Sequence, residues 1–124
     1  MKMHEVLSLQ DFYVAVKDSK LPLKTAYKLS RLMKRVEEEM QFYNQEFSKI
    51  LDEYAKKENN NFVFSKDGTS IEIIPGKEEE CNNKIIELKT LEIDLNNFSF
   101  TLDEFDGIDL TISEMNSLLP LIKD

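Results

Sequence analysis

A long heptad pattern is the feature that most constrains how this chain can fold. Between Pro22 and Glu58, apolar residues recur at alternating spacings of three and four, on the a and d positions of a heptad: Ala26, Leu29, Met33, Val36, Met40, Tyr43, Phe47, Ile50 and Tyr54. The pattern predicts one helix more than roughly 50 Å long, at 1.5 Å rise per residue. Because an exposed a/d stripe is not stable alone in water, this helix needs a partner helix, from the same chain or from another copy.

Two features further along the sequence offer that partner within the chain. Asp67-Gly68, between two runs of β-prone residues, predicts a β-hairpin over residues 62–74. After it, residues 77–91 are typical of a second helix, with acids at its amino end and one apolar face: Cys81, Ile85, Leu88 and Leu91. The simplest arrangement is an antiparallel helical hairpin over residues 22–91 that carries the β-hairpin between its two helices.

Three capping boxes predict further helix starts. Each has a hydroxyl residue with an acid three positions later: Ser8 and Asp11, Thr101 and Glu104, Thr111 and Glu114. They predict a first helix over about 9–17 and two short C-terminal helices, over about 102–106 and 112–123. Residues 91–100 alternate in polarity, which indicates an extended segment.

The fold class that these patterns predict is α+β and mainly helical. It is a long, coiled-coil-like antiparallel helical hairpin with a β-hairpin between the helices and short capped helices within residues 101–123. A chain of 124 residues is normally one domain, so we expect a single domain over residues 1–124.

Composition limits the class of protein. The net charge is −8, yet residues 1–57 hold 11 basic and 9 acidic side chains while residues 58–124 hold 5 and 15. This polarity predicts either complementarity between the halves or two faces with different partners. No run approaches the ~18 apolar residues of a membrane span, and the amino terminus lacks a signal-peptide cleavage pattern. The single cysteine, Cys81, is typical of a core residue in a reducing compartment, so we expect a cytoplasmic protein with no membrane partner.

Residue types for catalysis and cofactor binding are scarce. His4 is the only histidine, and no Ser–His or Cys–His pair can be argued around it. The glycines stand far apart, at Gly68, Gly76 and Gly107. The acidic run 103–109 is the best metal candidate, but Phe105 breaks the ligand alternation of a calcium loop, which favours a solvated acidic turn. The sequence therefore predicts a non-enzyme with neither cofactor nor metal.

A basic stripe on the long helix is the main candidate for binding. In the heptad frame five cations share an outer face: Lys24, Lys28, Arg31, Lys34 and Arg35. Cations near a helix amino end oppose the macrodipole, so another requirement can explain them. Three interpretations stay open: an acidic partner or phosphate backbone, the chain's own acidic segment folded over the stripe, or a solvated surface. The acidic chain and the few interleaved aromatics disfavour nucleic acid.

Two other groups of residues are candidates for contact with a partner. Phe42 lies off the heptad seam and forms an interaction patch if no other helix covers it. The second group comprises the acids of the C-terminal segment: Asp103, Glu104, Asp106 and Asp109.

Several stretches carry a resemblance to a known family. They include Leu21-Pro22-Leu23-Lys24-Thr25-Ala26-Tyr27-Lys28-Leu29, Glu80-Cys81, Leu91-Glu92-Ile93, Phe100-Thr101-Leu102-Asp103-Glu104 and Leu118-Leu119-Pro120. From about Leu21 to Lys123, the chain resembles a family of small, mostly uncharacterised proteins of tailed bacteriophages from low-GC bacteria. The resemblance provides no catalytic residues to carry over. It implies a phage-encoded protein that acts in the host cytoplasm.

The expected function is a non-enzymatic protein-interaction module that inhibits or redirects a host or defence protein. The alternative is an oligomeric virion component or assembly chaperone, with copies joined through the heptad seam. A third hypothesis is a nucleic-acid-binding accessory protein that uses the basic stripe.

Overall fold

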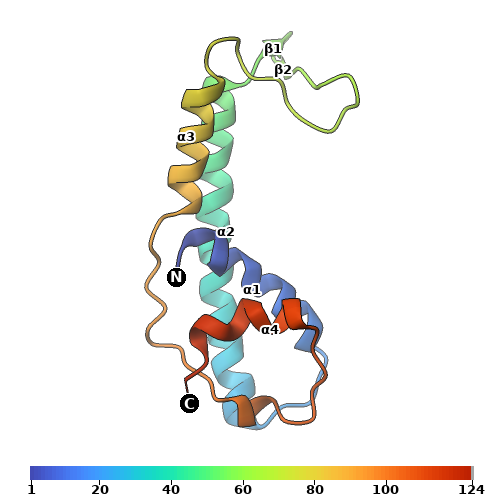
Figure 1. Cartoon of the computed structure of the whole chain (residues 1–124), viewed down its shortest axis with the longest axis vertical. Coiled ribbons are helices and arrows are strands. Elements are labelled where there is room, and N and C mark those ends of the chain that lie inside the picture. Colours follow the sequence, from blue (N-terminus) through green and yellow to red (C-terminus); the bar gives the residue numbers. More distant parts are fainter. Residues whose placement is uncertain (124) are drawn as a thin grey trace. The chain divides into compact units, whose positions relative to one another are not determined.

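The computed structural model describes residues 1–123 and is mainly helical, with a small two-stranded antiparallel sheet. In chain order the elements are α1 (Met3–Val16), α2 (Leu23–Tyr54), β1 (Lys57–Glu58), β2 (Asn61–Phe62), α3 (Glu78–Lys89), the 3₁₀ helix η1 (Leu102–Phe105), α4 (Ile112–Leu118) and the 3₁₀ helix η2 (Leu119–Leu121) (Figure 1). The coarse prediction of a mainly helical α+β chain is confirmed. Within the described range, no helix is both long and apolar enough to cross a membrane.

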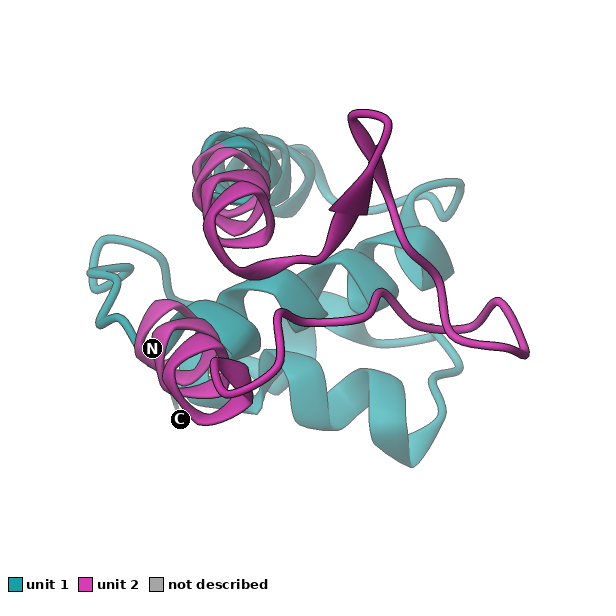
Figure 2. Cartoon of the chain, turned by 90° about the horizontal axis from the view of Figure 1, so that it is seen from above, with its two compact units in different colours: residues 1–41, 91–124 teal, residues 42–90 magenta. Residues whose placement is uncertain are grey.

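The chain divides into two compact units (Figure 2). Unit 1 comprises residues 1–41 together with the chain from Leu91 onward, and unit 2 comprises residues 42–90. Helix α2 runs through the boundary without a break, since it extends from Leu23 to Tyr54. The expectation of a single domain therefore stays a prediction.

Helix α1 begins at Met3 rather than at Leu9, so the start predicted from the first capping box is wrong. The backbone N–H of Lys2 donates to Oε1 of Glu5 at 2.9 Å, which provides the cap. The hydroxyl of Ser8 lies within the helix and donates to the carbonyl of Glu5 at 2.6 Å. The helix extends backwards because its apolar face does: Met3, Val6, Leu9, Phe12 and Val16 are all fully buried.

The segment before α1 is held by residues 91–93. Met3 N–H donates to the carbonyl of Leu91 at 2.8 Å, and Ile93 N–H donates to the carbonyl of Met1 at 2.7 Å. The extended segment predicted over residues 91–100 therefore makes backbone contacts at its start. It forms isolated bridges rather than a regular strand: Lys2 with Glu92, and Phe100 with Ile122.

The core of unit 1 is built by α1, the first half of α2 and the C-terminal segments. Phe105 joins them, because its ring centroid lies 5.4 Å from that of Phe12 and 5.5 Å from that of Phe100. Leu118 of α4 and Leu121 of η2 complete the same cluster. Such aromatic and aliphatic burial supplies most of the stability of a small unit.

The buried face of α2 in unit 1 differs from the predicted heptad seam. Leu29, Met33 and Val36 are buried as predicted, but the a/d residue Ala26 is exposed. Thr25 and Leu32, which lie off the seam, are buried at 2% and 0% exposure. The reason is that α1 and the C-terminal segments both pack on this half of α2, and two neighbours bury a broader face than one coiled-coil partner.

The two-stranded sheet of unit 2 lies earlier in the chain than the predicted β-hairpin. Strand β1 pairs with β2 in antiparallel register: Lys57 with Phe62 and Glu58 with Asn61. Asn59 and Asn60 form the two-residue connection with φ of 52° and 66°. Asn tolerates this left-handed conformation, which a tight hairpin turn requires at both positions. Helix α2 consequently ends at Tyr54, four residues before the predicted end at Glu58.

The Asp67-Gly68 turn forms where the sequence predicts it, without regular strands on either side among the described residues. The flanking runs meet in a single bridge between Phe64 and Ile71. The Asp67 carboxylate accepts hydrogen bonds from the hydroxyl of Ser65 and from the N–H and hydroxyl of Thr69. These bonds lower the pKa of Asp67 to about 2.

Helix α3 agrees closely with the helix predicted over residues 77–91. Cys81 and Leu88 are buried on it, and burial raises the pKa of the Cys81 thiol, so its predicted place in a core is confirmed. Tyr54 at the end of α2 is buried as well. That burial, followed by nearby charges including Glu80 at the start of α3, raises the pKa of the Tyr54 hydroxyl.

The two C-terminal capping boxes are confirmed. Thr101 N–H donates to Glu104 at 2.9 Å at the start of η1, and Glu114 N–H donates to the Thr111 hydroxyl at 3.1 Å at the start of α4. The helix predicted over 112–123 is divided into α4 and η2. Pro120 lies in η2, where its missing N–H does not support a continued α-helix.

Candidate functional site

Four of the five stripe cations line a surface cavity of about 440 Å³ in unit 1, here called the basic cavity. Its lining residues are Tyr27, Lys28, Arg31, Lys34, Arg35, Glu38, Asn97 and Phe98. Lys24 is exposed on the same helix and lies outside this lining. The structure therefore brings together most of the predicted stripe.

Two elements build the basic cavity. Helix α2 supplies the cations, because spacings of three and four residues place Lys28, Arg31 and Arg35 on one side of a helix. The segment before η1 supplies Asn97 and Phe98. A turn fixes that segment, since Phe98 N–H donates to the carbonyl of residue 95 at 2.9 Å, and Phe98 also packs against the core of unit 1.

Lys28 is held by contacts within the molecule. Its Nζ lies 2.7 Å from Oε1 of Glu104 and donates to the carbonyl of Ser99 at 2.8 Å. The same ammonium lies 4.7 Å from the ring centroid of Phe100, within range of a cation–π interaction. Lys28 thus joins α2 to the C-terminal segment and forms a fixed edge of the basic cavity.

Arg31 and Lys34 are the cations that remain available in the basic cavity. Arg35 is paired, since its Nε lies 3.0 Å from Oε1 of Glu39 one turn along α2. Within residues 1–123, no acidic side chain forms an ion pair with Arg31 or Lys34. The guanidinium carbon of Arg31 lies 5.8 Å from the ring centroid of Tyr27, which orients it over an exposed aromatic face.

Glu104 is the acid that the structure brings to the stripe. Burial alone would raise its pKa, but hydrogen bonds from Lys28 and from the Thr101 N–H, with the charge of Lys28, lower the pKa below its usual value. The Thr25 hydroxyl adds a longer bond at 3.4 Å. The carboxylate is consequently ionised at neutral pH and committed to internal partners.

The other acidic candidates do not reach the basic cavity. Asp103, Asp106 and Asp109 are exposed and lie outside its lining in the described part of the chain. The interpretation that the chain's own acidic segment covers the stripe therefore holds for one pair, Lys28 with Glu104. In the same described part, no group of three or more potential metal-ligating side chains lies close together.

Phe42 is the first residue of unit 2 and does not line the basic cavity. Its side chain is 42% exposed, which leaves it as a candidate contact residue on α2. Phe42 belongs to unit 2 and the stripe cations belong to unit 1, so Phe42 is a separate candidate for partner contact.

Sequence reasoning missed the aromatic part of the basic cavity. Tyr27 was recognisable as an apolar residue off the heptad seam, which signals a contact outside a coiled coil. Phe98 carries no local signal, because it reaches the stripe only through the fold of the C-terminal segment. Few aromatics interleave with the stripe in the sequence, and Phe98, 70 positions after Lys28, adds one in the fold.

The lining chemistry of the basic cavity is that of an anion-binding surface. It combines four guanidinium and ammonium groups with two aromatic rings, an amide and one carboxylate, that of Glu38. The cations outnumber the acid, and guanidinium and ammonium groups bind carboxylates or phosphates through charge-assisted hydrogen bonds. In comparisons with known proteins, no family model, no curated protein and no solved structure matches this chain.

Proposed function

We propose that this chain is a non-enzymatic protein-interaction module whose basic cavity binds an acidic segment of a partner protein. The observation that carries the proposal is that Arg31 and Lys34 line the basic cavity without an ion pair within the described chain, and that Arg31 lies beside the exposed ring of Tyr27. In a chain of net charge −8, two available cations and an aromatic ring in one cavity are a localised binding feature rather than a general basic surface.

The physical basis is the energetics of such a surface. Arg and Tyr are the side chains that most often dominate protein–protein binding, since they bury much area and still form directed hydrogen bonds. An acidic segment would place carboxylates on Arg31 and Lys34 and apolar atoms against Tyr27 and Phe98. Of the three interpretations of the basic stripe, this proposal takes the one in which the stripe binds an acidic protein partner.

We place this module in the setting that the sequence resemblance implies. In this proposal the chain is phage-encoded, acts in the host cytoplasm, and inhibits or redirects a host or defence protein by occupying its acidic segment. An oligomeric virion component and a nucleic-acid-binding accessory protein are the alternatives that an experiment must separate.

We also propose that unit 2 forms the antiparallel helical hairpin expected from the sequence, with the sheet between its helices. The burial of Tyr54 on α2 and of Cys81 and Leu88 on α3 supports this arrangement, as does the effect of Glu80 on the pKa of Tyr54. In the proposal this hairpin holds the distal part of α2.

A charge-reversal pair tests the function. Arg31→Glu removes one available cation, whereas the matched control Lys24→Glu makes the same charge change at an exposed position of α2 outside the basic cavity. Tagged wild type and both variants are incubated with bacterial host lysate, and the captured proteins are quantified by mass spectrometry. We expect a protein with an acidic segment that wild type and Lys24→Glu retain and that Arg31→Glu loses by at least about tenfold.

The alternatives give different results in the same experiment. Capture of DNA or RNA, with loss in the Arg31→Glu variant and no protein partner, would support the nucleic-acid hypothesis and contradict the proposal. Equal loss in both variants would show a general charge effect rather than a site. Light scattering of the purified chain tests the oligomeric alternative, which requires a defined mass above that of the monomer.

A further inference from the structure

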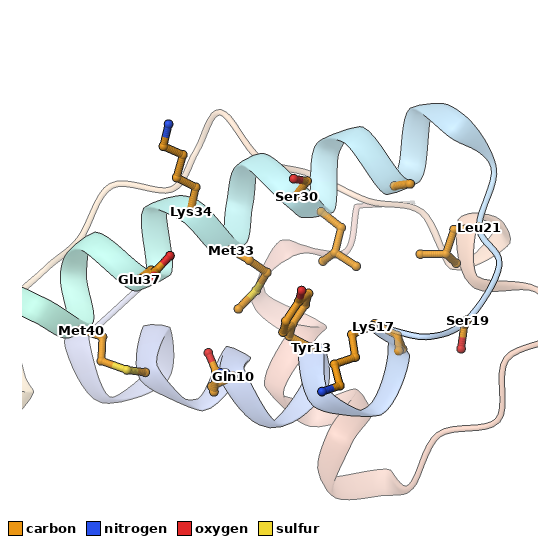
Figure 3. A pocket seen from close by; sticks show the side chains of 13 residues that line it. Gln10, Tyr13, Lys17, Ser19, Leu21, Ser30, Met33, Lys34, Glu37 and Met40 are labelled. Carbon is orange, nitrogen blue, oxygen red and sulfur yellow. The ribbon is translucent and has the colours of Figure 1, made fainter.

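A second cavity in unit 1 lies between α1 and α2 and has a volume of about 650 Å³ (Figure 3). We call it the α1–α2 groove. Tyr13 of α1 and Met33 of α2 point toward one another across it, Leu21 lies at one end and Met40 at the other (Figure 3). A cavity of this size is within the range of those that hold ligands or side chains of a partner.

The floor of the α1–α2 groove includes part of the predicted heptad seam. Ala26, Met33 and Met40 line it at intervals of seven residues along α2. Ala26 is exposed and Met40 is half-buried, whereas the seam residues Leu29, Met33 and Val36 are buried in the core. The two ends of this stretch of the seam are therefore accessible, and its centre is covered by unit 1.

We propose that the α1–α2 groove binds an amphipathic helix of a partner protein, with acidic residues beside its apolar stripe. This inference goes beyond the proposed function, because it concerns a second cavity, which shares Lys34 with the basic cavity, and a different recognition mode. A helix laid into an apolar groove presents anchors at spacings of three, four and seven residues. Ala26 to Met40 spans two heptads, or about 21 Å along the helix axis, which matches about four turns of such a partner helix.

The charged residues that line the α1–α2 groove indicate which charge a bound helix would carry. Lys17 of α1 and Lys34 of α2 both line the groove, and the Lys34 side chain extends from the outer side of α2 (Figure 3). Neither lysine forms an ion pair with an acid in the part of the chain that the structure describes. Glu37 is the acid in the described lining, which leaves a net positive lining. Acidic residues flanking the apolar stripe would pair with these lysines.

A second copy of the chain is the competing occupant of the α1–α2 groove, because its helices also expose apolar side chains: Ile86 of α3 is 50% exposed and Ile112 of α4 is 82% exposed. A symmetric contact between the grooves of two copies would bring two net positive linings together, which is unfavourable. The occupant is therefore assigned to a different protein, and the dimer measurement below tests the second copy.

Designed helical peptides test this assignment. The probes are three monomeric, side-chain-stapled 18-residue peptides: one with Leu anchors at positions i, i+4, i+7 and i+11 flanked by Glu, one with the same anchors flanked by Lys, and one with the anchors replaced by Ser. Binding is followed by fluorescence anisotropy, and NMR of the ¹⁵N-labelled full chain locates it. We expect the Glu-flanked peptide to bind at least about tenfold more tightly than the other two, with shifts at Tyr13, Ala26 and Ser30.

Two groove variants and one matched control complete the test. Ala26→Arg fills the floor from an exposed position, and Ser30→Arg places the same side chain on the α2 rim. Gln41→Arg adds an identical residue at an exposed position of α2 outside both cavities. Each groove variant that keeps the wild-type circular dichroism spectrum should weaken the Glu-flanked peptide by about tenfold or more, while Gln41→Arg leaves its affinity unchanged.

The outcomes separate this inference from the proposed function. Equal affinity for the Glu- and Lys-flanked peptides, or unchanged binding in both folded groove variants, would overturn it. A dimer in sedimentation equilibrium that Ala26→Arg abolishes would identify a second copy as the occupant and would also overturn it. If the Arg31→Glu variant still captures the acidic partner protein, the proposed function is wrong. That result does not affect the binding of the helical peptide to the α1–α2 groove.

Discussion

Glu104 joins two parts of unit 1 through one carboxylate. Its Oε2 accepts the backbone N–H of Thr101, and its Oε1 lies 2.7 Å from Lys28 Nζ. The Thr25 hydroxyl, on a side chain that is 2% exposed, also donates toward Oε1 at 3.4 Å. Since a buried hydroxyl without a partner costs free energy, Glu104 both caps η1 and satisfies a polar atom of α2.

Glu104→Gln tests this role through its pH dependence. The folded-state pKa of Glu104 lies below the ordinary value of 4.5, so the ionised carboxylate stabilises the fold above that pH and loses this contribution as the pH falls through the lowered pKa. We expect the variant to lose roughly 0.5–1.5 kcal/mol at neutral pH, and the difference from wild type to shrink on acidification. Urea denaturation from about pH 7 to about pH 3 measures it.

Asp103→Asn is the matched control, because it removes a charge from the adjacent, exposed acid without an ion pair in the described chain. It should change the free energy of unfolding by less than about 0.5 kcal/mol. A Glu104→Gln deficit that grows toward acid pH would contradict the assigned direction of the pKa shift.

Helix α4 shows how much a short element depends on its cap. With seven residues it is too short to be stable by propensity, so its first-turn hydrogen bonds and its buried Leu118 hold it in place. The Thr111 hydroxyl accepts the Glu114 N–H at 3.1 Å, and Glu114 accepts the Thr111 N–H at 2.9 Å. Loss of one bond of this pair loosens a helix that closes the core of unit 1.

Thr111→Ala should therefore lower the free energy of unfolding by about 1 kcal/mol. Ser113→Ala is the matched control, since it removes a hydroxyl two residues later in the same helix that has no cap role. Thermal denaturation followed by circular dichroism measures both. Equal losses in the two variants would show that the deficit comes from hydroxyl removal in general rather than from the cap.

The elements that the sequence predicts well are those with local causes. The boxes at Thr101 and Thr111 need only residues three apart, and both form. The start of α1 was predicted wrongly because the chain before it is held by residues 91–93, a contact that no local pattern reveals. The position of the sheet differs from the prediction for a local reason: Asn59 and Asn60 adopt a left-handed turn, and the Asp67-Gly68 pair is the stronger turn signal in the sequence.

The basic cavity likewise combines features that the local sequence predicts with features that depend on the tertiary fold. The spacing of Lys28, Arg31 and Arg35 could be read from the sequence, because one helix places them. The place of Phe98 in the cavity and the pairing of Lys28 with Glu104 could not be read from the sequence, because both depend on how the C-terminal segment packs against α2. The exposed position of Ala26 likewise depends on which neighbours pack on the helix rather than on its heptad.

At the scale of the whole molecule, the two units differ in the size of their cores. Most of the buried apolar residues belong to unit 1, whereas the described residues of unit 2 contribute a small set: Tyr54, Ala55, Cys81 and Leu88. A region with few buried contacts opens at lower free energy than a region with many. Unit 2 should consequently exchange its amide protons faster than unit 1.

Hydrogen exchange with two core variants tests this difference. Leu32→Ala removes a fully buried side chain of unit 1 and should lower the free energy of global unfolding by about 2–5 kcal/mol. Leu88→Ala, the matched change in unit 2, should mainly raise the exchange of amides within residues 42–90. Equal loss of protection throughout the chain in both variants would show that the units unfold as one.

The position of Lys34 couples binding at the two cavities of unit 1. It lines both the basic cavity and the α1–α2 groove. A carboxylate that pairs with this ammonium on one side removes its charge from the other side. Two acidic ligands would thus be coupled negatively, and each would weaken the other by the same factor. Such a shared residue favours the exchange of one partner for another over the binding of both at once.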